Sequence, residues 1–196
     1  MVAHVMERAR AALAAARETA DRSGLAYVRA KDGDGHDTDG NAGRRALVLW
    51  AAQFDWQPAD LALHRFLAEQ EALCRGSAPF QGTSDEHELA RYLLARHRLV
   101  DDVWRQWSLK MANFDTSFAY DIEAVCAAGP AATLAYVRSS GHEERDALLA
   151  RFEQNLPADD DVERYFARKA RWFPAAADPS VWDDRAETLE YLEAVR

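Results

Sequence analysis

Apolar residues recur at helical spacing along most of this chain. In the first stretch, Val5, Ala9, Leu13 and Ala16 fall three or four positions apart, and charged residues occupy the positions between them. That period is typical of an amphipathic helix with one face in a core. The same period predicts further helices at 44–54, 58–75, 84–96, 101–111, 115–126, 130–137, 141–152, 159–173 and 180–195. No stretch shows the alternation of a strong β-strand.

Short breaks separate these helices. Pro58 and Pro130 each suit the first position of a helix, and Ser84 and Asp101 suit a helix N-cap. Neighbouring helices joined by short connections pack as antiparallel hairpins. We therefore predict an all-α fold, a single domain of about eight to ten helices packed as helical hairpins. Either an irregular bundle or a short solenoid-like stack fits the irregular spacing of the breaks.

One loop divides the pattern. Residues 32–43, DGDGHDTDGNAG, are rich in Asp and Gly, and they separate an N-terminal helical segment, 1–31, from the main helical core, 44–196. Closely spaced aspartates are typical of calcium loops. Counted from Asp37, however, the sixth position is Ala42 and the twelfth is Val48, where such a loop has Gly and Glu. A solvated loop is the simpler interpretation, and cation binding stays open.

The charge balance narrows the classes of partner. The formal net charge of −9 argues against a nucleic-acid binder and against an anionic membrane surface, and it permits a basic protein partner. The first residues carry charges every few positions, unlike a signal peptide, and no apolar run is long enough to cross a bilayer. We therefore predict a cytoplasmic protein. Cys74 and Cys126 are expected to be buried thiols.

The common catalytic motifs do not assemble. The sequence contains no phosphate-binding glycine loop and no nucleophile elbow. His87-Glu88 begins a zinc-binding HExxH motif, but Arg91 occupies the position of the second histidine. We predict no catalytic residues, no metal and no cofactor, although several histidines fall on predicted helices and three of them could meet in a bundle.

The stretch 103–121, VWRQWSLKMANFDTSFAYD, concentrates aromatic and polar residues. In a structural interpretation its tryptophans are core, Asn113 ends a helix in the left-handed conformation, and Asp115 or Thr116 caps the next helix. In a functional interpretation the stretch lines a pocket in which a lysine holds an anionic group and aromatic rings stack on a planar ligand. The candidate residues are Trp104, Trp107, Lys110, Asn113, Asp115, Tyr120 and Asp121.

Three hypotheses of function follow. The first is a non-enzymatic binding or protein-interaction module with a groove lined by Trp and Lys, whose partner is a protein or a small anionic ligand. The second is a small metal-dependent hydrolase or lyase that uses His and Asp or Glu side chains on helices. The third is a homo-oligomer in which the Trp-rich face is the interface. The absence of a nucleophile–base pair in the sequence pattern favours binding over catalysis.

Overall fold

The computed structural model describes residues 2–31, 33–77 and 82–175 of the chain. Those residues form nine α-helices, which confirms the predicted all-α fold. The helix predicted at 180–195 lies outside the described residues. The helices are α1 (Val2–Glu18), α2 (Ala42–Phe54), α3 (Leu61–Ser77), α4 (Asp85–Ala95), α5 (Val103–Lys110), α6 (Phe114–Ala119), α7 (Pro130–Ser139), α8 (Arg145–Asn155) and α9 (Asp159–Trp172).

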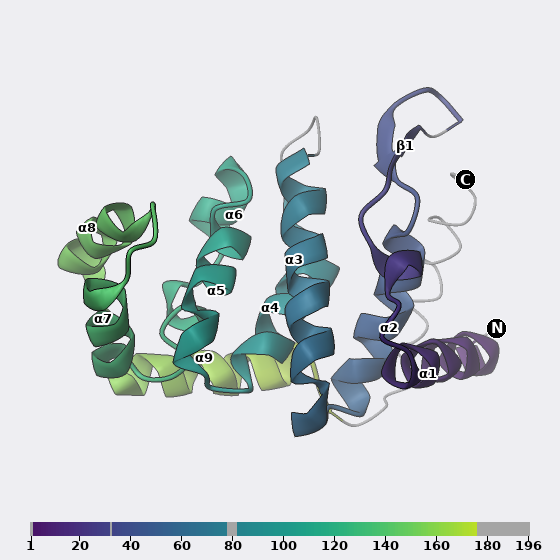
Figure 1. Cartoon of the computed structure of the whole chain (residues 1–196). Helices are drawn as coiled ribbons and strands as arrows, with labels where there is room; N and C mark the ends of the chain where they lie inside the picture. The colour runs from purple at the N-terminus through teal and green to yellow at the C-terminus, as the bar shows by residue number, and fades with distance from the viewer. Residues whose placement is uncertain (1, 32, 78–81, 176–196) are drawn as a thin grey trace.

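The helices stand in a row of pairs that α9 crosses (Figure 1). Helix α1 packs on α2, α3 packs on α4 and on α5, and α7 packs on α8. Helix α9 runs across the row and contacts the 3-10 turn Ile122–Ala124 (η4). Its first turn carries three aspartates and its last turn carries Lys169 and Arg171, so both ends complement the helix dipole.

Two main apolar clusters form the interior. The first contains residues of α1, α2, α3 and α4. It includes the run Ala46–Ala52 of α2, in which every residue is buried. A helix that is apolar on all sides belongs inside a core, and α2 takes that place. The second cluster joins α5, α7, α8 and α9, and Phe166 on α9 contacts both clusters. Among the described residues, no helix is both long and apolar enough to cross a membrane.

Two local predictions are wrong. The region of the acidic loop contains a small antiparallel sheet, in which β1 (Arg29–Lys31) pairs with β2 (Asp37–Asp39), and β2 falls inside the stretch predicted as a loop. The pairing needs only three residues a side, too few for a sequence pattern to show. The single helix predicted at 115–126 is interrupted after α6, and the chain resumes in η4.

A buried arginine fastens this sheet to the helices. Arg45 on α2 has no exposed surface, and its guanidinium pairs with Asp39 of β2 and with Glu71 of α3. The other carboxylate oxygen of Asp39 accepts hydrogen bonds from the backbone N–H groups of Val28 and Asn41 at 3.0 Å. Since a buried charge must be compensated, these contacts make the hairpin part of the core instead of a free loop.

Replacing Arg45 by methionine should destabilise the protein by about 3–5 kcal/mol, because the buried carboxylates of Asp39 and Glu71 lose their cation. Urea unfolding followed by circular dichroism measures the change. Arg44→Met is the matched control, since Arg44 is the exposed neighbour on the same helix, and it should change stability by less than about 0.5 kcal/mol. Equal losses in the two variants would contradict a role for the buried ion cluster.

Candidate functional site

A groove of about 680 Å³ lies between α3 and α5. Ala68, Ala72, Leu73 and Gly76 of α3 form one apolar side, and Trp104 of α5 forms the other. Concave apolar surfaces with a few polar groups are the usual form of binding sites. The groove therefore has the shape and the chemistry of a site for an apolar group.

The groove is also lined by polar and charged side chains. Arg105 donates from Nε to a carboxylate oxygen of Glu69 at 2.7 Å, which links α5 to α3 across the groove. Asp101 and Ser108 also line it. Since the charged residues of the lining are two acids and one arginine, the groove has no excess of positive charge for an anion.

Trp104 is held in position by a ring contact. Its indole stacks on the imidazole of His142, with 4.0 Å between ring centroids and 6° between the ring planes. His142 precedes α8, so the contact joins α5 to the α7–α8 hairpin. A stacked indole of this kind gives a fixed wall against which a ligand can pack.

The other predicted site residues lie elsewhere. Trp107 is buried in the second apolar cluster, and Asp115 is half-buried in the first turn of α6. Tyr120 and Asp121 follow α6 and belong to a separate polar network. The structure therefore does not bring the seven candidates together, and Trp104 alone among them lines the groove.

Lys110 is a structural cation. The residue is 3% exposed, and its ammonium donates hydrogen bonds at 2.6 Å to the backbone carbonyls of Ser117 and Tyr120. Burial, with Arg91 and Arg151 nearby, lowers the pKa of this lysine to about 8. A cation at the carbonyl end of a helix offsets its dipole, so Lys110 closes α6.

Asn113 begins a helix instead of ending one. Its backbone is extended, and its side-chain oxygen accepts a hydrogen bond from the N–H of Thr116 at 2.8 Å. The hydroxyl of Thr116 accepts in return from the N–H of Asn113 at 2.9 Å, which completes a capping box. The expected left-handed conformation of Asn113 is therefore wrong. The prediction failed because Asn serves both as a C-terminal residue and as an N-cap.

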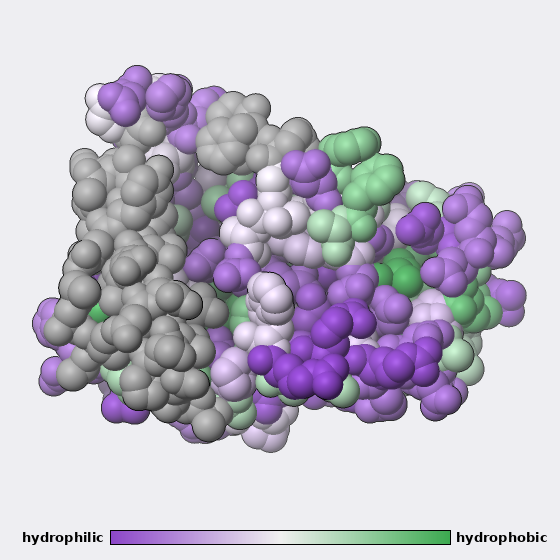
Figure 2. Space-filling model, turned by 180° about the vertical axis from the view of Figure 1, so that it is seen from behind, coloured by the Kyte–Doolittle hydropathy of each residue, from purple (hydrophilic) through white to green (hydrophobic). Residues whose placement is uncertain are grey.

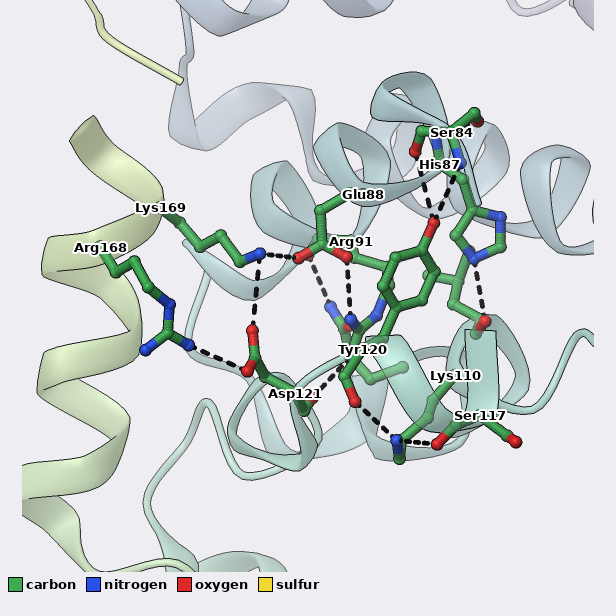
Figure 3. A network of polar contacts seen from close by, with 12 residues as sticks. Ser84, His87, Glu88, Arg91, Lys110, Ser117, Tyr120, Asp121, Arg168 and Lys169 are labelled. Carbon is green, nitrogen blue, oxygen red and sulfur yellow. Dashed lines mark hydrogen bonds and ion pairs between the residues drawn. The ribbon is translucent and has the colours of Figure 1, made fainter. Parts of the chain in front are cut away.

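A second cavity, of about 520 Å³, lies between α4, α6 and α9. Its walls include Ser84 just before α4, Glu88 of α4, Tyr120 after α6, and Trp172 at the end of α9. The hydroxyl of Tyr120 contacts the backbone of Ser84, both as acceptor from its N–H and as donor to its carbonyl oxygen (Figure 3). Burial raises the pKa of Tyr120 above its ordinary value.

Charged side chains hold the walls of this second cavity together. Lys169 of α9 pairs with Glu88 at 2.5 Å and lies 3.5 Å from Asp121, and Arg168 pairs with Asp121 at 2.9 Å (Figure 3). Glu88 also accepts a hydrogen bond from the buried Arg91. Sequence reasoning missed this network, because its members come from three separate helical regions and no spacing along the chain relates them.

Three further histidines, His64, His87 and His97, line neither cavity. Nδ1 of His64 and Nε2 of His97 share a hydrogen bond of 2.9 Å beside the ring of Trp56. His87 lies between the carbonyl oxygens of Glu71 and Leu109, so it joins α3, α4 and α5. These histidines therefore make hydrogen bonds that connect separate helices of the fold.

Among the residues that the structure describes, no group of side chains could hold a metal ion. No three His, Cys, Asp or Glu side chains of this part of the chain gather as metal ligands would. Burial raises the pKa of both thiols, Cys74 and Cys126, to about 12, which keeps them protonated and weakly nucleophilic. No protein-family model, curated protein or solved structure matches this chain.

Replacing Lys110 by methionine should cost about 2 kcal/mol or more, because two carbonyl groups at the end of α6 lose their donor. Thermal unfolding measures the loss. Lys31→Met, at an exposed lysine on β1, should change stability by less than about 0.5 kcal/mol. A Lys110→Met protein as stable as the wild type would contradict the structural role and return Lys110 to the candidate ligand-binding residues.

Acid should destabilise the fold through His64. Burial, with the nearby cations of His97, Arg96 and Arg17, lowers the pKa of His64 from 6.5 to about 3, while Asp60 opposes the shift. Between these two values the unfolded chain binds a proton that the folded chain does not, so stability falls as the pH drops below 6.5. We expect a slope of about 1.4 kcal/mol per pH unit from this group.

Urea midpoints measured between neutral and mildly acidic pH check this expectation. His64→Phe should flatten the profile, whereas His4→Phe, at an exposed histidine of α1, should leave it unchanged. Identical profiles for the wild type and His64→Phe would show that other groups cause the acid sensitivity.

Proposed function

We propose that this protein is a non-enzymatic binding module whose α3–α5 groove receives an apolar side chain of a protein partner. The observation that supports this most directly is the groove itself, about 680 Å³ in volume with Ala, Leu and Gly on one side and the stacked Trp104 on the other. Aromatic residues at the wall of a pocket are common anchors in protein interfaces.

The lining supports binding over catalysis. It contains no His, Cys or Lys, and its arginine is already paired with Glu69. Arg105 also contacts Asp102 at 3.3 Å, so its charge is shared between two acids. A small anion would compete with both carboxylates for this guanidinium, and the groove therefore favours an uncharged group.

The shape also indicates how much of a partner enters. A groove of this volume holds one or two apolar side chains, with Leu73 at its edge 52% exposed in the free protein. Covering Leu73 and Trp104 would remove apolar surface from water, which is the main favourable term in association. The partner is thus expected to present a branched or aromatic side chain on a short segment.

The proposal is tested by selecting displayed random peptides on the immobilised full-length protein. Ser108 is an exposed residue in the groove, so Ser108→Trp fills the groove without disturbing the core. Selected peptides should carry an apolar anchor, and their affinity should fall about tenfold or more on Ser108→Trp.

Ser139→Trp is the matched control, because Ser139 is exposed on α7 and lies outside the groove. The groove is ruled out as a site if no selected pool of peptides loses affinity on Ser108→Trp while keeping it on Ser139→Trp. Light scattering of the same proteins separates the homo-oligomer hypothesis, because a dimer that uses the groove would become monomeric on Ser108→Trp alone.

A further inference from the structure

The outer face of α9 is basic in an otherwise acidic protein. The chain carries a net charge of −9, yet Arg164, Arg168 and Arg171 fall four and three positions apart and so share one stripe of the helix. No acidic residue follows Glu163 within α9. Figure 2 shows hydrophilic side chains gathered as a band along α9 on this face of the molecule.

These arginines are largely available to a partner. Arg164 pairs with Asp161 of its own helix, and Arg168 pairs with Asp121, but the side chains of the two arginines are 68% and 50% exposed. Exposed ion pairs contribute little and exchange readily with water and other ions. No acid of residues 2–31, 33–77 and 82–175 pairs with Arg171.

Exposed aromatic rings lie on α9 and on α6. Trp172, the last residue of α9, is 67% exposed and lines the second cavity, and Phe118 of α6 is 77% exposed. Figure 2 shows hydrophobic side chains gathered over α6, above the hydrophilic band and separated from it by other side chains. Tryptophan and arginine are among the residues that most often anchor a protein interface, and here they lie together on one helix.

The basic residues that line the second cavity, Arg168 and Lys169, are paired with acids of the fold. Lys169 faces Glu88 and Asp121, so its ammonium is neutralised within the fold. Ala119 and Tyr120 give the cavity apolar surface next to the ring of Trp172. Arg168 lines the cavity and pairs with Asp121, while Arg164 and Arg171 lie on α9 outside the lining. The apolar surface beside Trp172 suits an uncharged side chain.

We propose that the outer face of α9 and the second cavity form an interface for an acidic protein segment. Its carboxylates lie against Arg164, Arg168 and Arg171, and one of its apolar side chains enters the cavity beside Trp172. Charge complementarity favours this partner, because three exposed arginines on one stripe attract carboxylates in a protein whose net charge of −9 otherwise repels them. The interface is separate from the α3–α5 groove and does not depend on it.

Peptide selection on the full-length protein tests this interface with its own variants. Among the selected pools we expect one in which Asp and Glu flank an aromatic or branched residue. Its affinity should fall about tenfold on Arg171→Glu or Trp172→Ala, and it should weaken as salt is raised. Ser108→Trp should leave this pool unchanged, so a failure of the groove proposal is distinguishable from a failure here.

Arg10→Glu is the matched control. Arg10 is an exposed arginine on α1, and its replacement changes the net charge by the same amount as Arg171→Glu. An equal loss of affinity in the two variants would show general charge repulsion and overturn the interface. A selection that returns no acidic pool would overturn it as well.

Vesicles containing phosphatidylserine provide the second arm of the test. Exposed arginine and tryptophan side chains also suit an anionic lipid surface. The proposed interface predicts no binding to these vesicles at physiological salt. Vesicle binding that is lost on Arg171→Glu and kept on Arg10→Glu would replace the protein segment by a membrane as the partner.

Discussion

A guanidinium group without access to water, that of Arg91, determines how three parts of the chain meet. It donates to Glu88 on its own helix at 3.1 Å and to the backbone carbonyl of Asp121 at 2.8 Å, and it lies over the ring of Tyr120. Glu88 in turn binds Lys169 of α9. Since an uncompensated buried charge costs several kcal/mol, these contacts form as a set. The walls of the second cavity are therefore fixed by the same charges that hold the core together.

Helix boundaries could be predicted where the signal is local. Ser84 accepts a hydrogen bond from the N–H of His87 and caps α4, Pro130 begins α7, and α9 begins at Asp159, as the pattern indicates. Each of these signals acts within one turn of the chain, so a single sequence contains it. The end of α6 could not be found in this way, because the cation that closes it, Lys110, comes from the preceding helix.

The candidate site was harder to predict for a related reason. Trp104 and Trp107 lie one turn apart on α5, yet one lines the groove and the other is buried in the core. The spacing shows that both face one side of the helix, but which flank of that side stays open depends on how α3 and the α7–α8 hairpin pack. In the same way, Arg45 and Arg91 read as surface residues in sequence, and only tertiary contacts reveal that they are buried.

Two sets of cations in this protein differ in how much the fold depends on them. Arg45, Arg91 and Lys110 are buried, and each satisfies groups that would otherwise be left without a partner. The arginines on the outer face of α9 satisfy nothing of comparable cost, since exposed ion pairs are worth less than about 1 kcal/mol. The helix dipole accounts for basic residues in the last turn of α9, but it requires neither three arginines on one stripe nor an exposed tryptophan beside them. Features that folding does not require are most often found where a protein meets another molecule, and in this chain they coincide on one helix face.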